Sequence, residues 1–346
     1  MKGILVLDNS LLKQILKEYD IKRNKAIQQA EERKKKLLEI NPRLSELDSE
    51  ISKLSIQTTK LILNSSDSEK QKLLSDLKKK INSLTKEKNF ILKQLSTSSD
   101  YLNPHFECKL CTDTGYVLKN EKSVMCSCLK QKIYDVSYNK SNIGNLEQEN
   151  FSKFDQRIFS PKQNNELYNS DFSPRENMLL LKEKAETFIN NFDDPNEKNL
   201  LFSGSTGLGK TFLTNCIANE LLKQGKTVLY QTAPVMFDSL MNAKFNKETN
   251  NYDLMNNILN VDLLIIDDLG SEKITESKIT ELFTILNTRL LNQNHKITKT
   301  IISTNLTVEE IFKTYTTRIG SRLAGNYRFL RFYGDDLRFK RVKKQD

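Results

Sequence analysis

Glycine and proline are almost missing from the first hundred residues, where only Gly3 and Pro42 occur. Both residue types mark turns and loops, so their scarcity excludes a region made of many short, turn-linked elements. Apolar residues instead recur at spacings of three and four, first from Leu44 to Leu54 and again from Leu73 to Leu95. This spacing predicts amphipathic helices. We expect residues 1–100 to form a helical, coiled-coil-like region with a long antiparallel hairpin, whose apolar stripe docks onto a partner or pairs with itself.

A long apolar run is also absent, which excludes a membrane-spanning helix. The opening run Ile4–Leu7 is too short to span a membrane, and no signal-peptide cleavage pattern follows it. Cysteine is scarce as well, since five occur in 346 residues and four of these lie between positions 108 and 128. Such bunching suits a metal site in a reducing compartment better than a set of disulfides. We therefore expect a cytoplasmic protein with no membrane partner.

Negative charge is in deficit at both ends of the chain. The formal net charge is +10, from 54 Lys and Arg against 44 Asp and Glu. Residues 1–102 carry +7 and residues 313–346 carry another +7, which leaves the middle of the chain slightly acidic. Basic ends are compatible with a nucleic acid partner, although a charged helix face is more often simply solvated.

The most informative stretch is a glycine-rich segment between an apolar run, Asn199–Ser203, and a helical pattern that begins near Phe212. The order strand, turn and helix, with this spacing of glycine, lysine and threonine, is that of a nucleotide phosphate loop. Glycines let successive backbone N–H groups point at phosphate oxygens, and the helix adds its N-terminal dipole. We expect ATP to bind along Gly204, Ser205, Thr206, Gly207, Leu208, Gly209, Lys210 and Thr211.

Individual side chains in and beyond this loop have predicted roles. Lys210 is expected to reach the β- and γ-phosphates, and the Thr211 hydroxyl is expected to ligate Mg²⁺. A second apolar run, Val261–Ile266, ends in Asp267 and Asp268. Asp267 is placed to bind the same Mg²⁺ through water, and Asp268 is placed to orient and polarise the attacking water. One carboxylate after a strand is common in turns, whereas a pair beyond a phosphate loop indicates hydrolysis.

Asn305 and a pair of arginines complete the candidate catalytic set. Asn305 follows the strand-like run 300–304, where its amide would lie between Asp268 and the γ-phosphate and hold the water. Arg318 and Arg322 are four residues apart on one predicted helix face. A guanidinium supplied to a neighbouring subunit's ATP stabilises transition-state charge. Solvated surface arginines are the plain alternative.

Cys108, Cys111, Cys126 and Cys128 have the spacing of metal ligands. A C-x₂-C pair turns two thiolates toward one ion, and a C-x-C pair completes the set. Four soft ligands favour tetrahedral Zn²⁺ and leave no open position for water, so we expect a structural zinc site. Reduced, unliganded cysteines and an iron–sulfur cluster are the alternatives. His105, just upstream, could replace one ligand.

The remaining segments set the expected domain limits. The cysteine cluster defines a zinc-binding module over residues 101–136. A polar, asparagine-rich stretch over 137–172 is expected to be a linker that carries three phenylalanines. Ser173, followed by proline and then by Glu176, predicts a helix start with a capping box. The ATPase domain is therefore expected over residues 173–346.

The phosphate loop, the two aspartates, Asn305 and the arginine helix together resemble an AAA+ ATPase. The cysteine cluster ahead of them and the closing run Gly334–Arg338 narrow the resemblance to bacterial replicative-helicase loaders of the DnaC/DnaI type. The resemblance is strong over residues 104–346 and only general before that. It implies an α/β fold, in which a five-stranded parallel sheet has the phosphate-loop strand in its middle and carries no helical lid. A helical region and a small zinc module precede this AAA+ core.

The resemblance also implies roles for single residues. Asn305 corresponds to the sensor-1 position, Arg322 to the arginine finger, and Arg338 to a sensor-2-like arginine that contacts the nucleotide. Asp268 stands where most AAA+ proteins have Glu, and its shorter arm predicts slow hydrolysis.

A further implied contact involves the predicted helix near residues 234–245. By resemblance this helix would touch single-stranded DNA, with Lys244 and Lys247 nearby.

The function that the resemblance implies is an ATP-dependent loader of the hexameric replicative helicase onto single-stranded DNA during initiation of replication. Its cofactors would be ATP, Mg²⁺ and Zn²⁺, and it would self-assemble through its ATP sites. Two alternatives stay open. One is a transposition helper ATPase, which shares the lidless core but usually lacks a zinc module. The other is a zinc-stabilised scaffold that binds ATP without turnover.

Overall fold

The computed structural model describes residues 9–63, 67–95, 99–137, 149–245, 251–292 and 296–338. Its contacts divide the chain into two compact units. Residues 13–124 form one, and the described residues from 125 onward belong to the other. In the described residues no helix combines the length and the apolar character that crossing a membrane requires.

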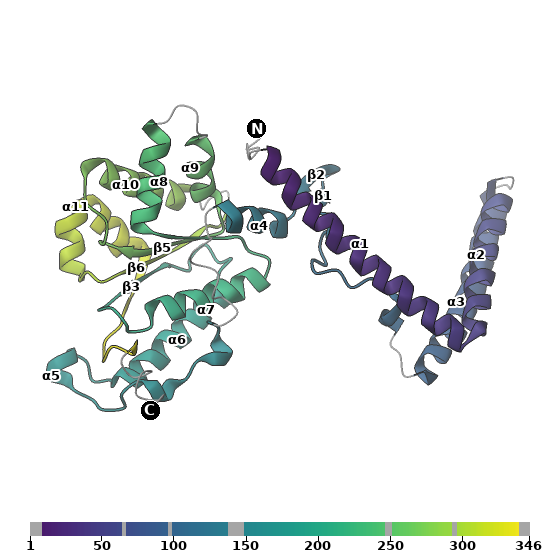
Figure 1. Cartoon of the computed structure of the whole chain (residues 1–346), viewed down its shortest axis with the longest axis horizontal. Coiled ribbons are helices and arrows are strands. Elements are labelled where there is room, and N and C mark those ends of the chain that lie inside the picture. The colour runs from purple at the N-terminus through teal and green to yellow at the C-terminus, as the bar shows by residue number, and fades with distance from the viewer. Residues whose placement is uncertain are drawn as a thin grey trace. The chain divides into compact units, whose positions relative to one another are not determined.

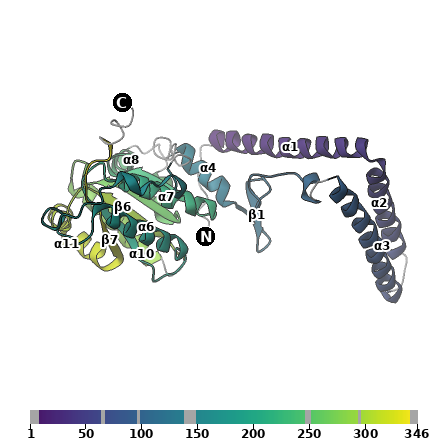
Figure 2. The ribbon, with the colours of Figure 1, turned by 90° about the horizontal axis from the view of Figure 1, so that it is seen from below.

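Three long helices dominate the first unit, namely α1 (Asn9–Ile40), α2 (Pro42–Leu63) and α3 (Asp67–Gln94) (Figure 1). The side-chain oxygen of Asn41 accepts the backbone N–H of Arg43 at 3.1 Å, and Pro42 begins α2 at a position where its missing N–H leaves no bond unmade. Helices α2 and α3 lie side by side (Figure 2), so the predicted helical hairpin is confirmed.

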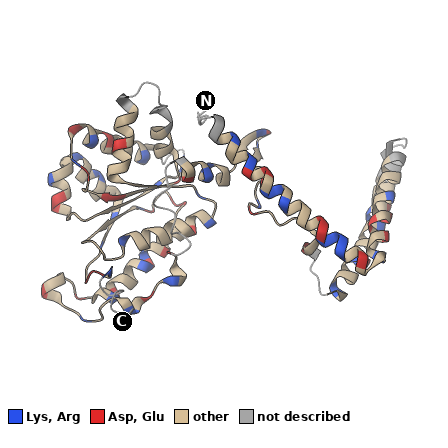
Figure 3. Ribbon diagram, viewed as in Figure 1, with Lys and Arg blue, Asp and Glu red and all other residues tan. Residues whose placement is uncertain are grey.

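Buried leucines, rather than charges, hold the base of this hairpin. Leu37, Leu44 and Leu92 come from the three different helices and form one buried cluster. Arg43 also binds Glu87 of α3 at 2.9 Å, and basic and acidic residues both occur along the helices (Figure 3). Exposed ion pairs of this kind contribute at most about 1 kcal/mol each. The apolar contacts therefore decide the hairpin's stability.

A short β-hairpin follows a 3₁₀ helix over Ser99–Leu102. Its strands are β1 (Tyr116–Lys119) and β2 (Lys122–Met125). The two residues between them, Asn120 and Glu121, have φ angles of 49° and 61°. Two successive left-handed residues are what a tight hairpin turn needs.

The second unit is an α/β domain. Its helices are α4 (Ser127–Ser137), α5 (Asn165–Tyr168), α6 (Pro174–Asn190), α7 (Lys210–Lys223), α8 (Ala233–Phe245), α9 (Asn251–Asn260), α10 (Glu276–Asn292) and α11 (Val308–Asn326). Its strands are β3 (Asn199–Ser203), β4 (Val228–Thr232), β5 (Leu263–Leu269), β6 (Lys299–Thr304) and β7 (Tyr327–Arg331).

These strands form one parallel sheet in the order β4-β5-β6-β3-β7. Helices α6 and α7 cover one face, and helices α8 to α11 cover the other (Figure 1). Both faces are buried, which explains why the inner strands are apolar without alternation. The five-stranded parallel sheet expected from the sequence is confirmed.

The position expected for the phosphate-loop strand was wrong in one detail. That strand, β3, is flanked by β6 and β7, so it is an inner strand, while β6 lies in the middle of the sheet. The reason is the last crossover, because α11 returns the chain to the far side of β3 and places β7 at the edge. After β7, the described residues up to Arg338 contain no helical lid.

The segment before α6 packs onto the domain. Phe159 is buried in the core beneath α6 and α7, and Phe151 and Phe154 pack against the same core. Helix α6 begins as predicted, because Ser173 and Glu176 form a complete capping box.

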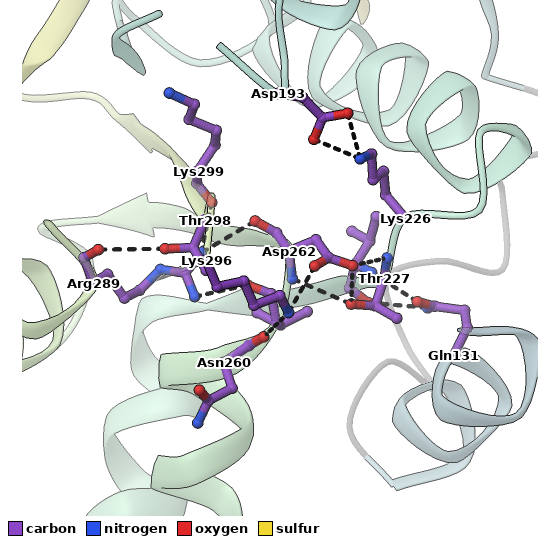
Figure 4. Close-up of polar contacts among 12 residues, drawn as sticks. Gln131, Asp193, Lys226, Thr227, Asn260, Asp262, Arg289, Lys296, Thr298 and Lys299 are labelled. Carbon is purple, nitrogen blue, oxygen red and sulfur yellow. Dashed lines mark hydrogen bonds and ion pairs between the residues drawn. The ribbon is translucent and has the colours of Figure 1, made fainter. Parts of the chain in front are cut away.

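A polar network ties together the amino ends of the strands (Figure 4). The fully buried Arg289 of α10 donates to the carbonyl oxygens of Ile258 at 2.7 Å and Lys299 at 2.7 Å. Burial lowers the pKa of Arg289 to about 10. Gln131 of α4 donates to the Val228 carbonyl at 3.0 Å and accepts the Val228 N–H at 2.7 Å. This side chain pairs with edge strand β4 as a neighbouring strand would, and so fixes α4 to the sheet.

Candidate nucleotide and metal sites

The glycine-rich loop joins β3 to α7 at the carboxyl edge of the sheet. Gly204, Gly207 and Gly209 have φ angles of 147°, 74° and 95°, which favour glycine. A Cβ atom at Gly204 would overlap the backbone carbonyl of Phe332, which is not free to move aside. The loop therefore has the backbone that a phosphate cradle needs, at the amino end of a 14-residue helix.

Lys210 is the first residue of α7 and is 6% exposed. Its ammonium donates to the carbonyl oxygens of Gly204 at 2.6 Å and Ser205 at 2.7 Å, and to the side-chain oxygen of Asn305 at 2.8 Å. Burial lowers the pKa of Lys210, and the two aspartates at the end of β5 oppose this shift. The structure thus brings Lys210 and Asn305 together.

Asp267 lies near the end of β5 and is 5% exposed. The Thr211 hydroxyl donates to its Oδ2 atom at 3.4 Å, so the two predicted Mg²⁺ ligands face each other. The Tyr230 hydroxyl also donates to Oδ2, and the Ser303 hydroxyl donates to Oδ1. A carboxylate beside a threonine hydroxyl is an oxygen donor set that suits Mg²⁺.

Strand β5 bulges at Asp268, beside this cluster. The pairing of β5 with β6 shifts between Ile266 and Leu269, and Asp268 has a φ of 54°. A bulge of this kind redirects one side chain, and Asp268 is accordingly exposed. Partial desolvation raises the pKa of Asp268, as does the charge of Asp267, while Lys210 acts in the opposite direction.

The segment after β7 returns to the loop. The Leu337 N–H donates to the Gly207 carbonyl at 2.9 Å. The charge of Arg338 lowers the pKa of both Lys210 and Asp268, so this exposed arginine belongs to the same electrostatic cluster. Arg338, the sensor-2-like arginine of the resemblance, thus lies within electrostatic reach of Lys210 and Asp268.

Arg318 and Arg322 are exposed on α11. In the part of the chain that the structure describes, neither guanidinium is engaged in a hydrogen bond or an ion pair. They are not brought into the Lys210 and Asp267 cluster. Of the predicted DNA-contacting residues, the Lys244 side chain and all of Lys247 lie outside the described residues.

The four cysteines come together as predicted. The sulfur atoms of Cys108, Cys111, Cys126 and Cys128 all lie within 4.8 Å of one another. Zn–S bonds of about 2.3 Å put tetrahedral sulfurs roughly 3.8 Å apart, so this cluster fits one ion. Among the described residues the cluster does not include His105. The four thiolates could therefore hold Zn²⁺.

Two residues at the site were not predicted from the sequence. Tyr230 and Ser303 belong to the strands on either side of β5, and each bonds Asp267. Burial and the neighbouring Asp267 raise the pKa of Tyr230, so it stays a donor. The sequence does place a hydroxyl side chain near the carboxyl end of each neighbouring strand. Connecting these hydroxyls to Asp267, however, requires knowledge of the strand order.

Known proteins share this domain. The family model for IstB-like ATP binding proteins matches residues 162–344. DnaC of Escherichia coli K12, a replicative helicase loader, is 31% identical over 206 residues, which are 58% of this chain and 82% of DnaC. A Sinorhizobium fredii protein provisionally described as an insertion sequence ATP-binding protein is 30% identical over 151 residues, which are 42% of this chain and 59% of that protein. A crystal structure of the DnaC helicase loader aligns with a TM-score of 0.40 and 22% identity over 55% of this chain and 99% of that one.

The family model spans more than half of the chain, and that span includes the phosphate loop and both aspartates of β5. The chain therefore belongs to the IstB-like ATP-binding protein family.

Proposed function

We propose that this protein is an ATPase that loads a hexameric replicative DNA helicase onto single-stranded DNA. The observation that carries the proposal is the similarity to the helicase loader DnaC over 82% of its length. The geometry at the ends of β3 and β5 supports the ATPase part, because Lys210 meets Asn305 and Thr211 meets Asp267 there.

We assign ATP binding to the loop and Lys210. The loop N–H groups and the α7 dipole bind the phosphates, and Lys210 exchanges the carbonyl oxygens of Gly204 and Ser205 for phosphate oxygens. Thr211 and Asp267 hold Mg²⁺, which neutralises developing charge on the phosphates when bound.

We assign the hydrolytic step to Asp268 and Asn305. Asp268 orients and polarises the attacking water, and its short side chain keeps turnover slow. Asn305 holds the same water, and its existing bond to Lys210 at 2.8 Å lets it respond to the state of the phosphates.

Two arginines complete the site across subunits. Arg338 acts on the nucleotide of its own chain, which its electrostatic coupling to Lys210 supports. Arg322 reaches the ATP of a neighbouring subunit, and its exposed position on α11 supports this. The protein thus self-assembles through its ATP sites.

The cysteine cluster binds one structural Zn²⁺. The zinc module and the helical region then bind the helicase, and the α/β domain binds ATP and DNA. Long amphipathic helices with exposed apolar positions such as Ile56 and Leu74 support a docking role for that region.

Affinity capture of the full chain from cells of its source organism tests the proposal. Recovery of the replicative helicase supports it. Recovery of a transposase instead supports the transposition helper, an alternative that the similar S. fredii protein favours. If neither is recovered and purified protein binds ATP without turnover, the function is that of a scaffold.

A further inference from the structure

The Asp267 carboxylate is enclosed by hydroxyl groups from both neighbouring strands. Tyr230 on β4 is 2% exposed, and Ser303 on β6 is fully buried. Asp267 lies on β5 between these two strands. Three adjacent strands thus contribute one residue each to a single buried polar cluster at the carboxyl edge of the sheet.

The two hydroxyls donate hydrogen bonds to different oxygens of the Asp267 carboxylate. Tyr230 donates to Oδ2, the atom that also lies 3.4 Å from the Thr211 hydroxyl. Ser303 donates to Oδ1, which also accepts the Asp268 N–H at 3.1 Å. With both oxygens held, the carboxylate has no freedom to rotate about its last bond.

Ser303 has a second contact that ties Asp267 to the bulge. Its hydroxyl oxygen accepts the Asp268 N–H at 3.2 Å, while its proton goes to Asp267. The hydroxyl therefore links β6 to the bulged part of β5. One side chain fixes both the Asp267 carboxylate and the backbone that redirects Asp268.

We propose that Tyr230 and Ser303 are positioning residues that hold Asp267 in the orientation needed to bind Mg²⁺ beside Thr211. This inference rests on the proposed ATPase function and adds residues from β4 and β6 to it. Carboxylates that bind metals are themselves usually hydrogen-bonded, and removing such a partner typically costs about 10- to 100-fold in metal affinity. Tyr230→Phe removes one donor and keeps the ring that fills the core.

A buried tyrosine–carboxylate bond can also be purely structural, and the same domain contains a matched example. Tyr315 on α11 is 1% exposed and donates to Glu272 rather than to Asp267. Tyr315→Phe removes the same chemical group from an equally buried position. It is therefore the control for general loss of stability.

The test is binding of a fluorescent, non-hydrolysable ATP analogue to the full chain, titrated with Mg²⁺ and also measured in EDTA. For Tyr230→Phe we expect the apparent Mg²⁺ affinity to fall at least about 10-fold, with analogue affinity in EDTA unchanged. Tyr315→Phe should match the wild type in both measurements. Ser303→Ala should show the same loss as Tyr230→Phe, and this gives an independent variant should the phenylalanine fold poorly.

A Mg²⁺ affinity within twofold of wild type for both Tyr230→Phe and Ser303→Ala would overturn the inference. So would an equal loss of analogue binding in EDTA, because the role would then be structural. Failure of the proposed function has a different signature, namely a wild-type protein that shows no Mg²⁺-dependent binding of the analogue.

Discussion

Replacing Lys210 by methionine separates nucleotide binding from folding. Lys210 and Lys299 are both buried lysines of the α/β domain, but Lys210 follows the carboxyl end of β3 whereas Lys299 lies at the amino end of β6. Lys210 donates to three oxygens at the loop, whereas Lys299 donates to the backbone carbonyls of Asp194 at 2.9 Å and of Glu197. Methionine replaces the apolar stem of either side chain with one of similar length, and it removes the ammonium group with its charge and its bonds.

The expected magnitudes follow from those contacts. A hydrogen bond to a charged group contributes about 1.5–3 kcal/mol, so losing one lysine–phosphate contact should weaken ATP binding roughly 10- to 150-fold. The cost to folding should be smaller, because burial penalises the charged form of Lys210, as its lowered pKa indicates, and the substitution removes that penalty. Lys299→Met removes another lysine whose pKa is lowered by burial, at the amino end of β6 rather than at the loop.

Calorimetric titration with ATP, beside thermal unfolding, measures both quantities. Lys210→Met should unfold near the wild-type temperature and bind ATP at least about tenfold more weakly. Lys299→Met should bind ATP as the wild type does. The reasoning is refuted if Lys210→Met binds ATP within about threefold of wild type, or if Lys299→Met weakens binding equally.

Four further outcomes are expected. Asp268→Asn should hydrolyse ATP poorly yet unfold at an equal or higher temperature at pH 7. The raised pKa of Asp268 means that the folded protein favours the protonated carboxyl, so the ionised carboxylate present at pH 7 destabilises the fold, and Asn removes that cost. Unfolding curves at falling pH should show this advantage shrinking toward the usual Asp value of about 3.9. Arg322→Ala should bind ATP but turn it over slowly, and mixing it with Asp268→Asn should partly restore turnover, which a finger acting in cis would not allow. Elemental analysis should find about one zinc per chain, and less than roughly a tenth of an equivalent would exclude the site. A fragment starting at residue 170 should melt below one starting at 125, because it lacks the buried Phe159 and Tyr134, and such aromatics typically contribute about 3–5 kcal/mol each; equal melting would contradict this.

Local patterns predicted the elements that carry the site. The glycine spacing before Lys210 identified the phosphate loop, and the apolar run before Asp267 identified β5. Each is encoded within about ten consecutive residues, so no knowledge of strand order was needed. The capping box at Ser173 is equally local and was also confirmed.

The features that escaped prediction depend on contacts between distant segments. Tyr230 and Ser303 meet Asp267 only because β4 and β6 flank β5. Helix α10 was not predicted, and its Arg289 is buried only because five oxygens of α9, β6 and the connection between α9 and β5 surround it. A charged residue within a helix normally indicates a solvated face, so periodicity alone would place the Arg289 side chain in solvent rather than in the core.

The most direct test of the central claim is a reconstituted loading assay on circular single-stranded DNA coated with its binding protein. The replicative helicase of the source organism is added with ATP and with wild-type protein or Lys210→Met. The account predicts that wild-type protein increases DNA-bound helicase in an ATP-dependent manner and that Lys210→Met does not. It would be contradicted if wild-type protein left the amount of bound helicase unchanged.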